Sequence, residues 1–295
     1  MIDCNGLIVG WGPAGTTGTE AMRLVMESLL HRVFGPIGHR GARQGAFCPT
    51  APEGWCLYAI GDVHGESRCL ETLLSVIAAD HRQRFGDSGE QPVLVFLGDY
   101  VDRGPDSRGV LDILCRLATA DAGGHGPACR FLGGNHEAAL LDFLADPVAG
   151  AEWLSYGGAE TLASYGVRAS TGIFDPVRCR ALRDRLAERL PASHRVFLDR
   201  LEPMVTLGDY VFVHAGVRPG VPLERQRRED LQWIREPFLS SQRFHGKVVV
   251  HGHTPVDQPQ FFSNRIAVDT GAYATGILTA VSLCQTESRV LKAIR

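Results

Sequence analysis

The chain has 295 residues, 44% of them hydrophobic and 21% charged, which is an ordinary globular composition and excludes wholesale disorder. Thirty basic residues stand against 33 acidic ones and give a formal net charge of -3, so the chain lacks the basic excess of a dedicated nucleic-acid binder. The apolar run over residues 6–9 is broken at once by glycine and proline and follows no basic segment, so we expect neither a signal peptide nor a membrane span.

Residues 1–54 differ in composition from the rest of the chain. A start rich in glycine and threonine and one amphipathic stretch, residues 20–34, precede a run rich in glycine, proline and arginine over residues 35–54. We predict an N-terminal extension with a linker, followed by a folded domain over residues 55–295. The segment Gly10-Trp-Gly-Pro-Ala-Gly15 fits the dinucleotide-binding pattern, but no second strand ending in an acidic residue follows it, so no nucleotide cofactor is expected.

Short apolar runs alternate with helical segments from residue 55 onward, which is typical of a layered α/β fold. The runs predict strands at residues 57–60, 93–97, 210–213 and 247–250, with closing strands at 265–269, 277–284 and 289–294. Amphipathic stretches predict helices at residues 67–79, 107–118, 136–144 and 177–189. Residues 146–201 carry no ligand-type motif and are predicted to form a helical cap beside the functional site.

The eight cysteines are scattered without a C-x-x-C pair or a dense framework. Cys179 and Arg185 have the C-x5-R spacing of cysteine phosphatases, but the residues between them lack glycine and are predicted to be helical, whereas a phosphate cradle needs free backbone amides. We therefore expect reduced, mostly buried thiols in a cytoplasmic protein, with no cysteine-based chemistry.

Polar side chains cluster directly after the predicted strands, where α/β enzymes place their functional residues. The sets are Asp62 with His64, Asp99 with Asp102 and Arg103, Asn135 with His136, His214, and His251 with His253. Carboxylates, imidazoles and an amide oxygen without thiolates suit the Mn, Fe or Zn ions of a hydrolytic centre better than a structural zinc site. Each set alone fits a capped turn or a core histidine, but their recurrence after successive strands predicts a metal centre.

These sets fall within five motifs that follow one another along the chain. The motifs are Gly61-Asp-Val-His-Gly65, Gly98-Asp-Tyr-Val-Asp-Arg-Gly104, Gly134-Asn-His-Glu137, His214-Ala-Gly216 and Gly252-His-Thr254. In this order they resemble the signature of the phosphoprotein phosphatase family of calcineurin-like metallophosphoesterases, in particular its bacterial and phage-like serine/threonine branch. The resemblance covers residues 61–271 and implies an α/β sandwich of two mixed β-sheets flanked by helices.

The resemblance also implies a role for each motif residue. Two divalent metal ions, expected to be Mn²⁺ with Fe or Zn as alternatives, would share a hydroxide that attacks phosphorus in line, without a covalent phosphoenzyme. Asp62, His64 and Asp99 would hold one ion, and Asp99, Asn135, His214 and His253 would hold the other. His136 would be the general acid, Asp102 its orienting carboxylate, and Arg103 a phosphate-binding residue.

Two further residues have weaker support from the pattern. Arg235 ends the segment Asp230-Leu-Gln-Trp-Ile-Arg235, which resembles the Trp-x-Arg stretch of bacterial and phage phosphatases and implies a second phosphate-binding arginine. The alternative for Arg235 is a surface arginine without a role. His251 has no ligand role in the pattern and is predicted to pack behind the site.

Three functions are compatible with these motifs. The leading prediction is a protein serine/threonine phosphatase that acts on a phosphoprotein or phosphopeptide, with neither nucleic acid nor membrane as a partner. The alternative is a symmetrical diadenosine tetraphosphate hydrolase or another nucleotide or small-molecule phosphoesterase. That hydrolase tends to show alanine in place of Asp102 and aspartate in place of Glu137, and this sequence departs from it at both positions. A non-enzymatic phosphate-binding scaffold is not expected, because no motif ligand is missing.

Overall fold

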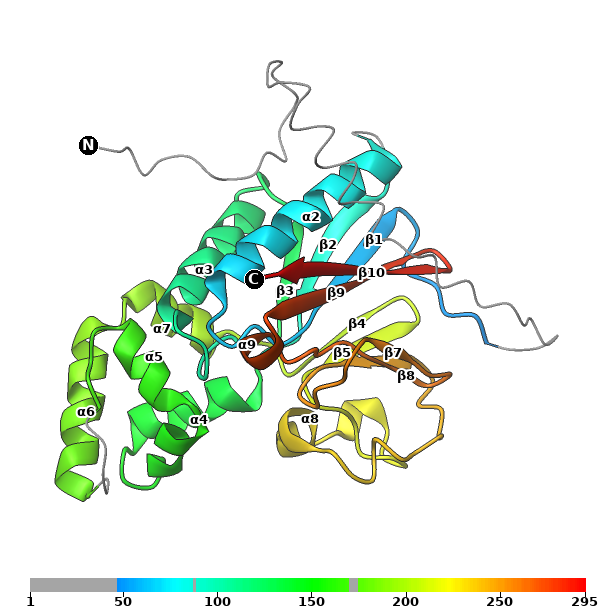
Figure 1. The fold of residues 1–295 in the computed structure, drawn as a ribbon. Helices are drawn as coiled ribbons and strands as arrows, with labels where there is room; N and C mark the ends of the chain where they lie inside the picture. The colour runs from blue at the N-terminus through cyan, green and yellow to red at the C-terminus, as the bar shows by residue number, and fades with distance from the viewer. Residues whose placement is uncertain (1–46, 87–88, 170–174) are drawn as a thin grey trace, which may run out of the picture.

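The computed structural model describes residues 47–86, 89–169 and 175–295 (Figure 1). The amphipathic stretch at residues 20–34, the glycine pattern at residues 10–15 and most of the predicted linker lie outside the described residues. Within the described ranges, no helix combines the length and the apolar character needed to cross a membrane.

Two five-stranded sheets form the framework of the molecule (Figure 1). The first has the order β10 (Glu287–Ile294), β9 (Ile277–Cys284), β1 (Trp55–Ile60), β2 (Gln91–Phe96), β3 (Ala128–Phe131). The second has the order β4 (Met204–Leu207), β5 (Tyr210–Val213), β6 (Val248–His251), β8 (Arg265–Ala267), β7 (Gln260–Phe261). Both sheets are mixed, because β1–β2–β3 and β5–β6–β8 run parallel while the flanking strands run antiparallel.

Alternating side chains along the strands build the core between the sheets. Leu57 and Ala59 of β1 face the second sheet, where they join Phe212 of β5 and Val250 of β6 in one buried cluster. The intervening residues of β1, such as Tyr58, face the opposite way and pack against helices. This period of two is what a strand buried on both faces requires.

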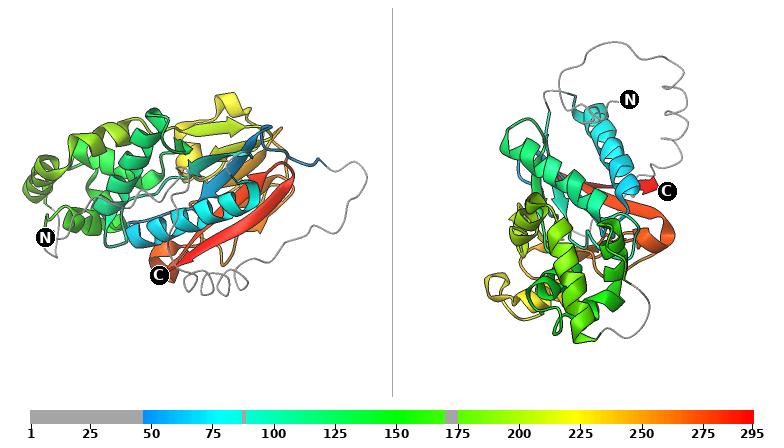
Figure 2. Two further views of the ribbon diagram at one scale, coloured as in Figure 1. Left: turned by 90° about the horizontal axis from the view of Figure 1, so that it is seen from above. Right: turned by 90° about the vertical axis from the view of Figure 1, so that its left-hand side faces the viewer.

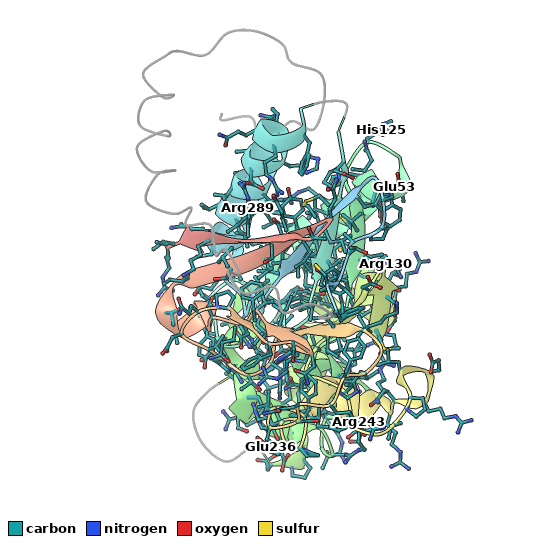
Figure 3. The ribbon with its side chains drawn as sticks, turned by 90° about the vertical axis from the view of Figure 1, so that its right-hand side faces the viewer. Glu53, His125, Arg130, Glu236, Arg243 and Arg289 are labelled. Atoms are coloured by element: carbon teal, nitrogen blue, oxygen red, sulfur yellow. A yellow bond between two sulfur atoms is a disulfide. The ribbon has the colours of Figure 1, made fainter. Side chains whose placement is uncertain are left out.

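Helices cover the outer faces of the sandwich, as Figure 2 shows from two further sides. α2 (Ser67–Phe85) and α3 (Ser107–Ala122) pack on the first sheet, and α8 (Arg228–Trp233) packs on the second. The remaining helical elements are α4 (Asn135–Ala145), η1 (Ala151–Tyr156), α5 (Gly158–Ser164), α6 (Pro176–Arg189), α7 (Ala192–Asp199), η2 (Leu223–Arg225) and α9 (Ala272–Thr275). Charged side chains such as Glu236, Arg243 and Arg289 lie on the exposed surface (Figure 3).

The predicted sandwich of two mixed sheets flanked by helices is confirmed. The predicted strands and helices are present with ends shifted by a few residues, and the helix predicted at residues 67–79 runs on to Phe85. The sequence pattern does not predict β3, β4, α5, α7 or α8, all of which are four to eight residues long. The predicted strands β5 and β6 are equally short but consist almost entirely of apolar residues, whereas the missed elements mix polar and apolar residues over too few positions to establish a period. Residues 151–199 do contain helices, and their function as a cap stays a prediction.

One cysteine pair departs from the sequence prediction. Cys56 of β1 and Cys284 of β9 form a disulfide, so the expectation of reduced thiols is wrong for these two residues. They are 228 positions apart in sequence, but strand register places them opposite each other with their Cα atoms 4.4 Å apart. Only the register of the sheet brings them together, and cysteine spacing does not report register. Cys69 and Cys129 are free and buried, as expected.

Candidate metal centre

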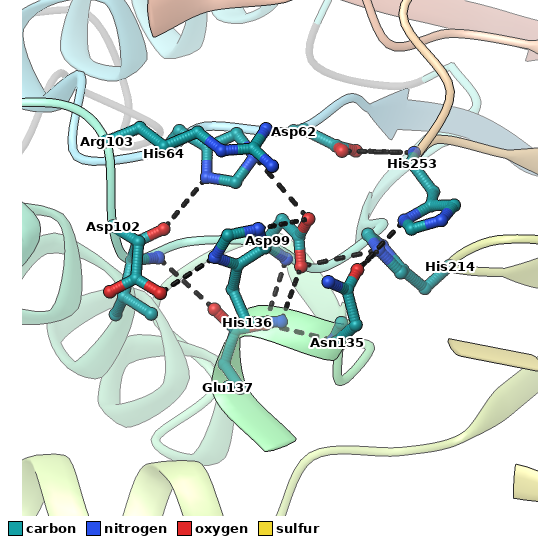
Figure 4. Close-up of polar contacts among 12 residues, drawn as sticks. Asp62, His64, Asp99, Asp102, Arg103, Asn135, His136, Glu137, His214 and His253 are labelled. Carbon is teal, nitrogen blue, oxygen red and sulfur yellow. Dashed lines mark hydrogen bonds and ion pairs between the residues drawn. The ribbon is translucent and has the colours of Figure 1, made fainter. Parts of the chain in front are cut away.

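The predicted ligands all lie where parallel strands of the two sheets end. Asp62 and His64 follow β1, Asp99 follows β2, Asn135 follows β3, His214 follows β5, and His253 follows β6. Because parallel strands align their carboxyl ends, these loops meet at one edge of the sandwich. Figure 4 shows the side chains converging there, and all six are buried.

The loop after β1 presents His64 with one ring nitrogen fixed. Its Nδ1 lies 2.9 Å from the Val101 carbonyl oxygen, which can only accept, so Nδ1 carries the proton and Nε2 keeps a lone pair. That lone pair points to Asp99, whose Oδ2 is 3.5 Å away. The turn is tight, because a Cβ on Gly65, which has φ 66°, would lie 2.8 Å from the backbone of Gly104. Val63 points into the core, as predicted.

His214 is fixed in the same way on the other side of Asp99. Its Nδ1 donates to the Leu97 carbonyl oxygen at 2.8 Å, which leaves Nε2 as the ring atom that faces the centre. Two oxygens lie near this atom: Asn135 Oδ1 at 2.9 Å and Asp99 Oδ1 at 3.3 Å. Burial lowers the pKa of His214, but the Asp99 carboxylate outweighs burial and raises it. The oxygen and imidazole chemistry of these groups fits a divalent ion.

Asp99 is the residue that the two groups of ligand atoms share. One group joins His64, Asp99 and His136, the other joins Asp99, His214 and His253, and within each the ligand atoms lie within 4.8 Å of one another. Burial opposes ionisation of Asp99, but the surrounding imidazoles outweigh it and hold the pKa of this carboxyl well below its ordinary value. The arrangement is therefore one anionic carboxylate between two sets of imidazoles.

Asp62 and His253 close the centre on the side of the second sheet. The backbone N–H of His253 donates to Asp62 Oδ2 at 3.0 Å, and His253 Nδ1 lies 2.9 Å from Asn135 Oδ1. The Nε2 atom of His253 is buried without a hydrogen-bond partner among the described residues, which suits a histidine of a metal-binding site. Asp62 lies outside both three-residue groups, although it faces the same space (Figure 4).

Burial sets the protonation of these residues. It lowers the pKa of His64 and of His253 to about 3, so both rings are neutral and can act as ligands at neutral pH. Burial likewise raises the pKa of Asp62, and the nearby Asp269 and Asp99 carboxylates raise it further. Buried carboxylates that raise one another's pKa are relieved by a divalent cation.

His136 and Asp102 form a hydrogen-bonded pair at the edge of the centre. His136 Nδ1 lies 2.7 Å from Asp102 Oδ2, and its Nε2 points toward Asp99 Oδ2 at 3.9 Å. Burial alone would lower the pKa of His136, but the Asp99 and Asp102 carboxylates outweigh burial and raise it. The structure therefore brings together the two residues that the sequence predicts as acid and orienting carboxylate.

The two predicted phosphate-binding arginines differ in placement. Arg103 Nη1 lies 3.1 Å from His64 Nε2, and its guanidinium lies over the Tyr273 ring, 4.9 Å from the centroid. Gly157, which has φ 107°, lets the next segment pass close to Arg103, since a Cβ there would lie 2.5 Å from the Arg103 nitrogen. Arg235 is exposed, and its charge reaches the centre only through its electrostatic effect on His253.

His251 lies behind the centre, where it was predicted to pack. Its ring is fully buried and meets Phe238 edge-on, with centroids 5.1 Å apart. Its Nδ1 lies 3.1 Å from the carbonyl oxygen of Gly252. His251 thus contributes packing rather than a ligand atom to the described centre.

Sequence reasoning assigned no role to Glu137, although this carboxylate connects two of the ligand loops. Its Oε2 accepts from the backbone N–H groups of Asp99 and Gly134, both at 2.9 Å. Its Oε1 accepts from those of Tyr100 at 2.7 Å and Val101 at 3.2 Å. The sequence feature that could have predicted this role is the position of Glu137 near the start of a helix. Glu137 is the third residue of α4 and completes a capping box with Gly134.

Comparisons with known proteins agree with this site. A model of the family described as calcineurin-like phosphoesterase matches residues 57–280. Two relatives carry the name asymmetrical bis(5'-nucleosyl)-tetraphosphatase PrpE. That of Geobacillus thermodenitrificans is 26% identical over 238 residues, which cover 75% of this chain and 88% of the relative. That of Bacillus anthracis is 25% identical over 248 residues, which cover 78% and 91%.

A solved structure has a similar fold. It belongs to a protein assigned provisionally as a diadenosine tetraphosphatase, with a TM-score of 0.55 and 21% sequence identity. The match covers 84% of this chain and 98% of that chain. At this identity the likeness concerns the fold alone.

Proposed function

The chain belongs to the calcineurin-like phosphoesterase family, and from that premise we propose that it is a metal-dependent phosphomonoesterase acting on phosphoserine or phosphothreonine in proteins. The observation that carries the proposal is the His136–Asp102 pair, 2.7 Å apart and almost fully buried beside Asp99. The family supports phosphoester hydrolysis, and the acid pair favours esters whose leaving group needs a proton.

The metal centre has a ligand set for two divalent cations. We assign Asp62, His64 and Asp99 to one ion, and Asp99, Asn135, His214 and His253 to the other, with Mn²⁺ as the first choice and Fe or Zn as alternatives. Such ions supply an activated water as nucleophile and neutralise the phosphoryl oxygens. The orientation of each ligand comes from the chain, since the Val101 and Leu97 carbonyls fix the tautomers of His64 and His214.

His136 is assigned as the proton donor to the leaving alkoxide. With Nδ1 held by Asp102, the proton to be delivered sits on Nε2, the ring atom that faces Asp99. The alkoxide of serine or threonine is a poor leaving group, so this proton lowers the barrier substantially. Arg103, with several N–H donors at the edge of the centre, is assigned to the phosphoryl oxygens, and Arg235 to a weaker role at the rim.

A second candidate function is the cleavage of dinucleoside polyphosphates. It is favoured by the names of the relatives, which describe the asymmetrical reaction rather than the symmetrical one considered from the sequence. The same ligand set can hydrolyse esters and anhydrides. However, a nucleotide leaving group needs little protonation, so an anhydride substrate alone does not account for a buried acid pair.

Turnover of two substrates distinguishes these functions. A phosphoserine peptide and diadenosine tetraphosphate should be compared as kcat/KM with Mn²⁺, and again with Fe²⁺ and Zn²⁺. We expect the peptide to be preferred, and His136→Asn to reduce peptide turnover by about 100-fold or more, since a positioned acid contributes about 10²–10⁴-fold. Asp142→Asn, on the same helix α4 and outside the centre, is the matched control and should leave both rates unchanged. Strong preference for the nucleotide, with little effect of His136→Asn on it, would replace this proposal by the second function.

A further inference from the structure

The acid pair has two additional partners that lie outside every sequence motif. Trp153 Nε1 donates to the Asp102 carboxylate, 2.9 Å from Oδ2 and 3.1 Å from Oδ1. Thr161 Oγ1 donates to Asp102 Oδ1 at 2.6 Å. These donors come from η1 and α5, 51 and 59 positions after Asp102, and both side chains are buried.

The proton arrangement around Asp102 is fully determined by these contacts. The backbone N–H of Asp102 donates to Thr161 Oγ1 at 2.9 Å and to Ser107 Oγ at 3.0 Å. Since the hydroxyl proton of Thr161 is directed at Oδ1, Ser107 donates to Thr161 across 2.9 Å. The indole N–H can only donate. Both carboxylate oxygens therefore receive neutral donors, and the Nδ1 proton of His136 completes the set.

The Asp102 backbone also needs this support. Asp102 has φ 73°, in the left-handed region that non-glycine residues rarely adopt, and the next residue, Arg103, has φ 66°. A conformation of this kind persists only where surrounding contacts hold it. The two hydroxyls and the indole hold the backbone and the carboxylate of Asp102 at the same time.

The indole itself is locked in place. Its ring packs on Phe143 with centroids 4.8 Å apart, and it is only 1% exposed. A Cβ on Gly158 would lie 2.6 Å from the indole carbons, so the ring fits only against glycine there. A ring held by two close neighbours can aim its single polar atom, and here that atom is aimed at Asp102.

We propose that Trp153 and Thr161 are positioning residues, which hold the Asp102 carboxylate so that it directs His136 Nε2 toward the metal centre. This inference rests on the proposed function and extends it, because it makes the segment Ala151–Ser164 part of the proton-donating device. A carboxylate with too few donors would be free to rotate, and His136 would lose its direction without any change in the metal ligands.

The test compares leaving groups in matched variants. Trp153→Phe removes the N–H and keeps an aromatic ring, and Thr161→Val removes the hydroxyl and keeps the shape. Leu186→Ala is the control, because Leu186 of α6 belongs to the same buried cluster and is not one of the groups that hold Asp102 or the Trp153 ring. We expect Trp153→Phe and Thr161→Val to lower kcat on a phosphoserine peptide by about tenfold and on p-nitrophenyl phosphate by less than about threefold, since only the peptide needs the proton. KM and bound manganese, measured by elemental analysis, should stay unchanged.

A second measurement does not depend on activity. In protein without added metal, the ring Nδ1 proton of His136 should give a ¹⁵N-edited NMR signal, identified by its absence in His136→Asn. Trp153→Phe and Thr161→Val should shift or broaden this signal, whereas Leu186→Ala should lower the thermal midpoint and leave the signal in place.

Each outcome decides one question. Equal losses on both substrates, or an NMR signal that no variant moves, would overturn the positioning role. If Trp153→Phe does not fold, the comparison of Thr161→Val with Thr161→Ser decides. Thr161→Ser keeps the hydroxyl and should restore the activity that Thr161→Val loses. Identical behaviour of these two variants would overturn the positioning role. If the wild-type protein hydrolyses neither substrate with Mn²⁺, Fe²⁺ or Zn²⁺, the proposed function is refuted. The NMR comparison would then still test the positioning role of Trp153 and Thr161.

Discussion

Replacing Glu137 by glutamine should loosen the ligand loops before any substrate is present. The carboxylate accepts four backbone N–H groups, two on each oxygen, from the loops that follow β2 and β3. Glutamine offers one acceptor oxygen and one NH₂ donor, so two of the four buried N–H groups would face another donor.

The expected loss in the free energy of unfolding follows from the two unsatisfied N–H groups. A buried donor left without a partner costs about 1–3 kcal/mol, so the two together cost about 2–6 kcal/mol. Burying a neutral amide rather than a carboxylate offsets part of this cost, since burial raises the pKa of Glu137 to about 7. We expect the free energy of unfolding to fall by about 2–4 kcal/mol and the thermal midpoint by about 4–16 °C.

Urea and thermal unfolding of protein without added metal measure this effect. Glu71→Gln, an exposed change on α2, is the matched control and should stay within about 0.5 kcal/mol of wild type. Manganese affinity of Glu137→Gln should fall as well, because the loop that carries Asp99 loses backbone hydrogen bonds in either orientation of the amide. A Glu137→Gln protein as stable as the control would show that the carboxylate does not brace the loops.

Three further outcomes are expected. Chelation should abolish turnover and lower the thermal midpoint, measured by calorimetry before and after manganese is restored, because the buried carboxylates of the centre then repel one another. Arg103→Ala should reduce kcat/KM by about 100-fold or more and exposed Arg235→Ala by less than about tenfold, and equal effects would contradict their assignment. Burial lowers the pKa of His194, so the unfolded chain binds a proton that the folded chain does not, and the free energy of unfolding should fall as the pH drops below about 6.5. His194→Gln should flatten this dependence in urea titrations, whereas His125→Gln, at an exposed position, should not.

The strand-end ligands could be predicted because each motif is contiguous in sequence. Asp62 and His64, for example, are separated by a single residue and directly follow a strand. The end of a strand can be recognised from the end of its apolar run. The sheet framework was predictable for the same reason, since β1, β2 and β6 contain uninterrupted apolar runs. Periodicity alone gives the strands and not their assembly into two mixed sheets, which the resemblance to a family implied.

The contacts that could not be predicted join residues far apart in sequence. Trp153 and Asp102 meet only because η1 and α5 pack against α4 and α3, and neither short element has a detectable period. Cys56 and Cys284 meet only through the register of two strands. The glycine pair at 157–158 lies within the predicted cap, and only the structure shows what each glycine accommodates: Arg103 packs against Gly157, and the Trp153 ring packs against Gly158.

The helical segment over residues 151–164 extends from the His136–Asp102 pair to the protein surface. Trp153 and Thr161 point inward to Asp102, while Tyr156 from the same segment is 37% exposed. The Tyr156 ring lies 6.4 Å from the rings of both His136 and Trp233, so it borders the acid and the exposed rim at once. A displacement of this segment would change the entrance and the direction of His136 together. Under the proposed function, substrate choice and proton delivery would be coupled, because the segment that borders His136 also holds the Asp102 carboxylate.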